Sequence, residues 1–502
     1  MFLSKLALSG ALLSFFAPAA LAQTASTDTL AEINTNISTA PAEMGAEVPN
    51  ITTQTAVTTQ LLNSITYQVQ EPSVDNDDVM VSTLALRFNI PQKHKIAKGE
   101  TLTLQKCIEI ALDQDPDLLN KQYAALGKQA EVKGAKSTYY PQIDASVSAY
   151  RYGAPYTNTN DTRVALQQGT YTQGAAGVTL KQLLLDFGSR SGSINSSRSA
   201  YAASRQDLED LATTVTNSVK KYYYNVIQAR RALEVNKEKV AQFKQNLSVA
   251  QAMFKNGQKP KYDVTKAETD LSGAQLDLIK ARNDYDLAWV SLNSLMFLIS
   301  PQPFHIEDNL DYVDYNITLD EILSKAFLNR PDLKMLQEQY NAMQFTLKAT
   351  RSAYYPSLYA NGAYNTTGTE SPYSQNWNAG LSLQLNIFQG MKTRAAVEQN
   401  TAQLNSVRAQ IYSKGRQIYL EAAQSVLNLN QSEERIINAQ AQVKQATENL
   451  QIATVRYNTG ISTPLELTDA TTSYSSAKLQ LIKALFDFKV AQADIEKAMG
   501  SR

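Results

Sequence analysis

The stretch YYPQIDASVSAYRY, residues 139–152, carries the pattern that decides the fold. After Pro141, apolar and polar residues alternate, which is the period of a half-exposed β-strand and not that of a helix. A second alternating stretch, residues 176–183, follows a polar loop, so the sequence predicts a pair of strands. The apolar positions of the first strand are Ile143, Ala145, Val147 and Ala149, and Asp144, Ser146 and Ser148 lie between them.

The same stretch recurs in the second half of the chain. Tyr139-Tyr140-Pro141 returns as Tyr354-Tyr355-Pro356 at an offset of 215, and 13 of the 39 positions in 103–141 are identical to their counterparts. From Gly177 onward the offset is 203. A second pair of strands is predicted at 357–364 and 377–387. The chain is therefore a duplication.

Long segments of helical periodicity surround each pair of strands. In the first half an amphipathic helical segment is predicted at 103–138, a very long helix at about 190–257 and a shorter one at 263–298. A helix over 190–257 would be roughly 100 Å long, since each residue adds 1.5 Å. The long helices carry apolar residues at alternating spacings of 3 and 4, which predicts a coiled-coil seam. The seam residues are Leu233, Asn236, Val240, Phe243, Leu247, Ala250 and Phe254 in the first half, and Ile436, Ala439, Val443, Ala446, Leu450, Ala453 and Tyr457 in the second.

The N-terminal part of the chain has a different character. Residues 1–22 have a basic start, an apolar run and a small-residue cleavage site, which predicts a signal peptide. Residues 23–100 are polar and are predicted to form a flexible extension, with one short strand near 79–88. The remaining predicted units are the first repeat at 101–300, a linker at 301–317 and the second repeat at 318–502.

Composition excludes several classes of function. The chain of 502 residues has 47 basic and 47 acidic residues, so it lacks the net positive charge that nucleic-acid binding requires. With one cysteine, Cys107, and two histidines, it cannot build a multi-thiolate or histidine-rich metal site. We find no catalytic constellation and expect no enzymatic activity and no cofactor. The Gly-Met-Lys-Thr at 390–393 lacks the upstream glycine of a phosphate-binding loop.

Four predicted strands in an exported chain suggest a membrane role. Four strands cannot close a barrel, and lipid does not tolerate an open sheet edge, but three chains would supply twelve strands. A homotrimer in contact with outer-membrane lipid is therefore predicted, while a soluble β-sandwich with ordinary tyrosines is the alternative. Aromatic residues near the strand ends would form interfacial girdles in the first case. They are Tyr139, Tyr140, Tyr150, Tyr354, Tyr355 and Trp377.

The duplication, the Tyr-Tyr-Pro before each pair of strands and the glycine turn between long and short helices together resemble the TolC family of outer-membrane efflux and export channels. The resemblance covers about residues 100–500. It implies an α+β membrane protein, in which long antiparallel coiled-coil helices form an α-barrel and the four strands of each chain join a trimeric 12-stranded β-barrel. It also implies two partners, namely a periplasmic adaptor (membrane fusion) protein and an inner-membrane transporter, and a location in the outer membrane that extends into the periplasm.

The resemblance further assigns roles at the two helix turns. Glu466 and Asp469 match carboxylates that form a ring at the periplasmic constriction, Tyr457 matches a linking tyrosine and Asp263 its acidic partner. The family often has a linking arginine two residues after the turn glycine, where this chain has Ser462, so hydrogen bonds would replace a salt bridge. The exposed turns would dock the adaptor through Asn256, Gly257, Thr459 and Gly460.

Residues alone also support a structural interpretation of Glu466. Thr463-Pro464-Leu465-Glu466 is a capping box with proline at the first helical position, so Glu466 would serve as a cap. For the chain as a whole, the predicted function is a passive exit duct of a drug-efflux or type I protein-secretion system. The alternatives are a non-conducting periplasmic coiled-coil bridging protein and an exported enzyme with a helical stalk.

Overall fold

The computed structural model describes residues 94, 96–153, 170–298, 304–369 and 374–501. The predicted signal peptide, most of the polar extension and its strand near 79–88 lie outside these residues. The described chain has two halves with the same order of elements, with two short strands, β1 (Thr101–Leu102) and β4 (His305–Ile306), before and between them. The first half comprises α3 (Leu104–Gln114), α4 (Pro116–Ser137), β2 (Gln142–Gly153), β3 (Thr170–Leu185), α5 (Ser189–Lys255) and α6 (Lys261–Leu295). The second comprises α7 (Leu319–Asn329), α8 (Pro331–Arg351), the 3-10 turn η1 (Ser352–Tyr354), β5 (Ser357–Gly368), β6 (Ser374–Gln384), α9 (Lys392–Asn458) and α10 (Pro464–Ala498).

The duplication is visible in the lengths of corresponding elements. The long helices α5 and α9 each have 67 residues, and α6 and α10 each have 35. Strands β2 and β5 each have 12 residues. The starts of both helix pairs differ by the offset of 203 that the sequence comparison gives. At 1.5 Å per residue, each long helix spans about 100 Å.

Local sequence determines where the first helices begin and break. Thr103 caps α3 by accepting a hydrogen bond from the Lys106 backbone N–H at 3.3 Å, and Thr318 caps α7 in the same way. The segment predicted at 103–138 is two helices, because Asp115 is extended and Pro116 begins a new helix without an N–H to donate. The Asp115 carboxylate accepts from the next free backbone N–H groups.

The four long strands form one antiparallel sheet in the order β2-β3-β5-β6. Every neighbouring pair is continuous in register except for a bulge between Leu183 and Leu185 of β3. The last strand has 11 residues, as many as the predicted 377–387, but it lies three residues earlier in the chain. It ends at Gln384, and the chain then turns through Gly390 and Met391, which both have positive φ. Within the chain, β2 and β6 are the two edges of this sheet.

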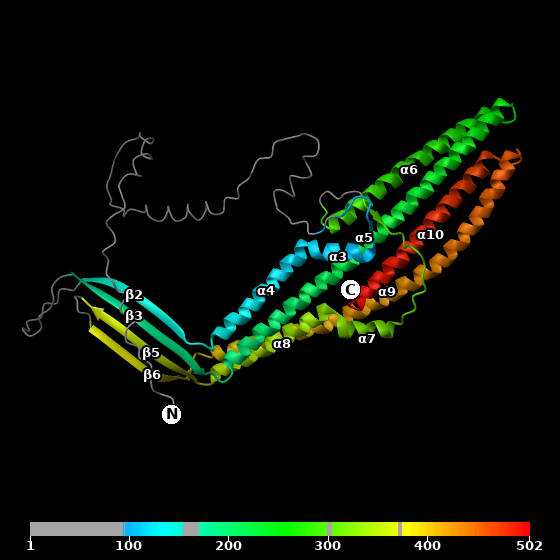
Figure 1. Ribbon diagram of the computed structural model, residues 1–502. Helices are drawn as coiled ribbons and strands as arrows, with labels where there is room; N and C mark the ends of the chain where they lie inside the picture. Colours follow the sequence, from blue (N-terminus) through cyan, green and yellow to red (C-terminus); the bar gives the residue numbers. More distant parts are fainter. Residues whose placement is uncertain (1–93, 95, 154–169, 299–303, 370–373, 502) are drawn as a thin grey trace, which may run out of the picture. The chain divides into compact units, whose positions relative to one another are not determined.

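Each long helix forms a hairpin with the helix that follows it, α5 with α6 and α9 with α10. Other helices pack on these hairpins, and the two halves also contact each other. Helices α4 and α6 both pack on α5, and α8 and α10 both pack on α9, as Figure 1 shows. Contacts of α5 with α8 and α10 join the two halves. Most predicted seam residues are buried or half-buried, including Ala250, Ile436 and Ala453, so the heptad prediction is confirmed. Phe254 is the exception, because it is 44% exposed while its counterpart Tyr457 is only 2% exposed.

The segment after Phe304, predicted as part of a linker, packs into the core. Strand β4 pairs in parallel with β1, and Leu310 is fully buried. Tyr223 of α5 donates a hydrogen bond to the Glu307 carbonyl at 2.8 Å, and Arg231 forms an ion pair with Asp308 at 2.7 Å. These contacts fasten the connection between the two halves to the long helix α5.

A buried ion network stabilises the break between α7 and α8. Arg330 and Asp332 are both buried and pair through two hydrogen bonds, of 3.1 and 2.7 Å. Arg330 also pairs with Glu421 of α9 at 2.6 Å, and Lys414 lies 3.3 Å from Asp332. Although burial raises the pKa of Asp332, the hydrogen bond from Arg330 and the charges of Arg330 and Lys414 outweigh it and hold the pKa below the usual value.

Candidate functional site

The turn between α5 and α6 and the turn between α9 and α10 are built alike. Two residues after each long helix ends, a glycine takes the left-handed conformation, with φ of +70° at Gly257 and +80° at Gly460. The Gly257 N–H donates to the backbone carbonyl of Phe254, and the Gly460 N–H donates to the backbone carbonyl of Tyr457, both at 3.0 Å. These bonds cap the C-termini of the two helices. A residue with a side chain at either glycine position would strain the turn, because the left-handed conformation favours glycine. The four predicted docking residues, Asn256, Gly257, Thr459 and Gly460, are all exposed.

Glu466 lies at the start of α10. Thr463 accepts a hydrogen bond from the Glu466 backbone N–H at 3.3 Å, so the threonine cap that the sequence predicts is present. The Glu466 carboxylate accepts a hydrogen bond from the Ser462 hydroxyl at 2.5 Å and lies 3.9 Å from the Arg456 guanidinium. Its side chain is still 51% exposed.

Asp469 follows three residues later on the same helix and is exposed. Residues three apart on a helix share a face. The structure therefore places the two predicted ring carboxylates one above the other on the exposed side of α10, next to the turn.

Tyr457 and Asp263 are brought together although they come from different halves. Tyr457 ends the seam of α9 and is 2% exposed, while Asp263 lies in the first turn of α6 and is 4% exposed. Burial raises the pKa of Tyr457, and the negative charge of Asp263 raises it further. Tyr457 also packs with Ala453, Leu467 and Ala470 in a small apolar cluster at this end of the helices. A neutral tyrosine is therefore held beside a buried carboxylate.

Lys259 makes contacts between the two turns that the sequence did not predict. It belongs to the α5–α6 turn, and its Nζ donates a hydrogen bond to the Ser462 carbonyl in the other turn at 3.3 Å. The same Nζ lies 5.9 Å from the centroid of the Tyr457 ring. The sequence signal was weak, because a lysine before a proline in a polar turn has no partner that spacing could reveal.

Further polar contacts link the two hairpins away from the turns. Thr468 of α10 donates to the Asp270 carboxylate of α6 at 2.7 Å, and Asp270 also pairs with Lys266. Farther along, Glu238 of α5 accepts from Tyr474 at 3.1 Å and from Lys478 at 2.7 Å, both on α10. The hairpins of the two halves are thus joined by several separate polar links.

The register of the sheet sorts its side chains into two faces of opposite character. Because side chains alternate along a strand, residues paired across the strands share a face. One face is largely apolar on all four strands: Ile143, Ala145, Val147, Ala176, Val178, Leu180, Leu358, Ala360, Tyr364, Trp377, Ala379, Leu381 and Leu383. Its polar members are Arg151, Thr170, Thr172, Gln182, Thr366 and Gln375. The other is largely polar: Asp144, Ser146, Ser148, Thr179, Lys181, Asn361, Asn365, Asn376, Asn378, Ser382 and Gln384.

The predicted interfacial aromatics divide between the two faces and ends. Tyr139, Tyr140, Tyr354 and Tyr355 precede β2 and β5, so they lie at the end of the sheet that adjoins the helices. Trp377 pairs with Tyr364 on the apolar face toward the other end. Tyr150 differs from the prediction, because alternation places it on the polar face with Ser146 and Ser148. A lipid-facing role for Tyr150 therefore does not fit the register.

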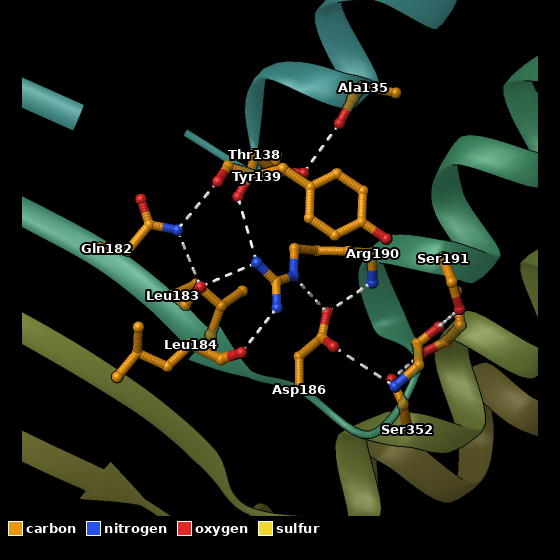
Figure 2. A network of polar contacts seen from close by, with 12 residues as sticks. Ala135, Thr138, Tyr139, Gln182, Leu183, Leu184, Asp186, Arg190, Ser191 and Ser352 are labelled. Atoms are coloured by element: carbon orange, nitrogen blue, oxygen red, sulfur yellow. Dashed lines mark hydrogen bonds and ion pairs between the residues drawn. The ribbon is translucent and has the colours of Figure 1, made fainter. Parts of the chain in front are cut away.

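A network around Arg190 fixes the junction of β3 with α5 (Figure 2). Its guanidinium donates to the carbonyls of Leu183 at 2.8 Å and Leu184 at 2.9 Å, next to the bulge. Asp186 accepts from the Arg190 backbone and side chain, at 2.6 and 3.2 Å. The guanidinium also stacks on the Tyr139 ring, 4.8 Å from its centroid. These contacts provide donors to the carbonyls at the end of the strand and link the strand to the start of the helix.

Two observations concern metal binding and the reactivity of the single cysteine. Among them, no group of three or more His, Cys, Asp or Glu side chains is placed to hold a metal ion. Cys107 is fully buried in α3, and burial raises the pKa of its thiol to about 12, so its reactive thiolate form is disfavoured.

No helix in the described ranges combines the length and the apolar character needed to cross a membrane.

Comparison with known proteins places this geometry in context. A family model described as "Outer membrane efflux protein" matches residues 107–296 and 322–501. "Outer membrane efflux protein BepC" of Brucella suis biovar 1 is 23% identical over 295 residues, which cover 58% of this chain and 62%, less than two thirds, of that protein. "Alkaline protease secretion protein AprF" of Pseudomonas aeruginosa is 22% identical, and the match covers 76% of this chain and 81% of AprF. "Outer membrane protein TolC" of Escherichia coli K12 is 25% identical, and the match covers 84% of each chain.

A solved structure supports the fold independently. A crystal structure of CusC, described in terms of folding and transmembrane channel formation, aligns with a TM-score of 0.71 at 17% identity. The alignment covers 86% of this chain and 99% of CusC. The predicted fold class of long helices combined with four strands is thereby confirmed.

Proposed function

The chain belongs to the outer membrane efflux protein family, and from this premise we propose that it is a passive channel-tunnel across the outer membrane and periplasm. Its location is the outer membrane. In this role the chain would be the exit duct of a tripartite drug-efflux or type I protein-secretion system. BepC is named for efflux and AprF for protease secretion. Relatives of both kinds therefore support the proposal of an exit duct.

The observation that carries the proposal is the register of the four-stranded sheet. An apolar face opposite a polar face is the pattern of strands with lipid on one side and a water-filled lumen on the other. Leu381 and Trp377 on the apolar face are 69% and 76% exposed in the single chain. A soluble sheet would bury such a face against a second layer.

Closure of the sheet requires further copies of the chain. The edges of β2 and β6 lack partners within the described chain, and lipid does not tolerate unpaired edges. Three copies joined edge to edge would give twelve strands and remove every edge. The two repeats, 101–300 and 318–502 with 301–317 between them, then serve as the two arms of one protomer of a homotrimer.

The two helix turns would form the periplasmic gate. Glu466 and Asp469 lie exposed on one face of α10, and three-fold symmetry would multiply them into a ring of six carboxylates that attracts cations. Tyr457 and Asp263, one from each hairpin and both buried, would help to hold the two hairpins of a protomer together beneath the turns. Opening would require the hairpins to separate at this contact.

In this role, partners would supply the energy for transport. The exposed turn residues Asn256, Gly257, Thr459 and Gly460 are suited to contact a periplasmic adaptor, which in turn would join an inner-membrane transporter. Neither nucleic acid nor a cofactor is expected to take part in this role. The alternative, a non-conducting periplasmic bridging protein, explains the helices but leaves the apolar sheet face without a role.

Single-channel recording tests the proposal directly. The purified mature protein is expected to form small, stable, cation-preferring steps in a planar lipid bilayer. Well-folded protein that conducts neither as the wild type nor with altered turn residues would favour the bridging alternative and would contradict a trimeric barrel.

A further inference from the structure

We propose that Lys259 is the cation of the gate latch in this chain, joining the two helix turns of each protomer. This inference rests on the proposed gating function and adds the residue that the sequence left open. The position two residues after Gly460 is Ser462, which is 1% exposed and directs its hydroxyl to Glu466 of its own hairpin. The Ser462 side chain therefore does not bridge the hairpins, whereas its backbone carbonyl accepts a bond from the other turn.

The geometry makes Lys259 a bridge between two different groups. It precedes Pro260, the residue that caps the start of α6, so its backbone is anchored at the turn. One ammonium donates to the Ser462 carbonyl at 3.3 Å and lies 5.9 Å from the Tyr457 ring, within the range of a cation–π interaction. Both partners belong to the α9–α10 hairpin, while Lys259 belongs to the α5–α6 hairpin.

These contacts exist only while the turns are together. An interaction shifts a conformational equilibrium only if it differs between the two states. Separation of the hairpins would remove both partners of the Lys259 ammonium at once. The same movement would expose the Tyr457 ring and the Asp263 carboxylate, which now lie buried. Lys259 therefore stabilises the closed state specifically.

Neighbouring lysines provide internal controls. Lys255 and Lys261 flank Lys259 in the same turn region, and both are exposed. Within the described residues, neither makes a side-chain hydrogen bond or ion pair. A general effect of positive charge at the turn would appear in all three positions, whereas a latch would appear only at Lys259.

The test is single-channel conductance of the full mature protein in planar bilayers. Lys259→Met keeps the length of the side chain and removes the donor, and it is expected to raise the open fraction about tenfold, the change that corresponds to about 1.4 kcal/mol. Lys259→Gln serves as a second neutral variant in case the first folds poorly. Lys259→Arg is expected to stay closed, and Lys261→Met is expected to match the wild type.

A reference variant separates failure of this inference from failure of the proposed function. Tyr457→Phe combined with Asp263→Ala removes the buried pair of polar side chains that lies nearest to the Lys259 contact. If this reference opens while both neutral Lys259 variants stay closed, Lys259 is not the latch and the channel function stands. If Lys261→Met opens as far as Lys259→Met, charge and not the bridge is responsible, and the inference is again wrong. If the reference does not conduct, the proposed function fails first.

Discussion

Tyr457 and Asp263, residues from opposite halves of the chain, are buried together, and the charge of Asp263 adds to burial in raising the pKa of Tyr457. Tyr457 ends the α9 seam and Asp263 lies in the first turn of α6, so they are close only because the two hairpins lie side by side. The equivalent of Tyr457 in the first half, Phe254, is 44% exposed. The duplicated architecture is therefore asymmetric at the point where a gate would need a link.

Removal of the tyrosine hydroxyl tests this link. Tyr457→Phe keeps the ring in its apolar cluster but removes the hydroxyl dipole beside the buried Asp263 carboxylate. A buried carboxylate with fewer polar neighbours is disfavoured, so we expect the closed state to be less stable by about 1 kcal/mol in each protomer. The measurement is the open fraction in planar bilayers, which should rise. Phe254→Leu is the matched control at the equivalent exposed position, and an equal effect there would contradict the assignment.

Alkaline pH should act on the same contact. The ordinary tyrosine pKa is 10.0, and that of Tyr457 is higher in the closed structure. The raised pKa means that the closed state favours the neutral tyrosine hydroxyl. The closed state therefore loses stability as the pH rises from the ordinary tyrosine pKa of 10.0 to the higher pKa of Tyr457. Conductance should therefore increase over this alkaline interval. In Tyr457→Phe the increase should be absent, and its persistence would point to other titrating groups.

Neutralisation of the exposed carboxylates on α10 tests the ring. Glu466→Gln with Asp469→Asn is expected to weaken the cation preference, because a ring of acidic side chains attracts cations to a constriction. The reversal potential across a salt gradient measures this preference. Glu448→Gln, an exposed carboxylate on α9 away from the turn, is the control. An unchanged reversal potential in the double variant would leave Glu466 with its capping position only.

The two faces of the sheet should respond oppositely to the same charge. Leu381→Lys places an ammonium on the apolar face, where lipid contact near the middle of a membrane costs about 2–4 kcal/mol. Ser382→Lys places it one residue away on the polar face, where a water-filled lumen would tolerate it. We expect loss of outer-membrane assembly for the first variant only, measured by membrane fractionation and thermal stability of the trimer. Equal tolerance of both would argue against membrane strands.

The buried ion pair at the α7–α8 break should govern acid stability. The pKa of Asp332 is held below its ordinary 3.8, so its charge contributes stability that is present above 3.8 and lost as the pH falls through the lowered value. Asp332→Asn removes the buried negative charge and leaves Arg330 paired with Glu421 alone. We expect the free energy of unfolding to fall by about 3 kcal/mol near neutral pH. Acid unfolding followed by circular dichroism measures it. Asp117→Asn, the exposed counterpart in the first repeat, should change little.

Several elements could be predicted from residues because their causes are local. The period of two in 142–152, the prolines at 116 and 331 and the glycines at 257 and 460 act on their own backbone. The duplication follows from identity at a constant offset, and equal helix lengths of 67 and 35 residues confirm it. The faces of the strands follow from alternation, which is also why Tyr150 could have been assigned to the polar face beforehand.

The sequence by itself thus determined the doubled architecture, the strands with two chemical faces and the glycine turns, since these depend on backbone geometry and on neighbours within a few residues. Only the tertiary structure decided which side chains meet across the halves. Tyr457 meets Asp263, and Lys259 meets the Ser462 carbonyl, at sequence separations near 200 residues. Such pairings depend on how the two hairpins lie against each other, and the carbonyl that Lys259 binds is present in every residue, so no pattern of letters can single it out.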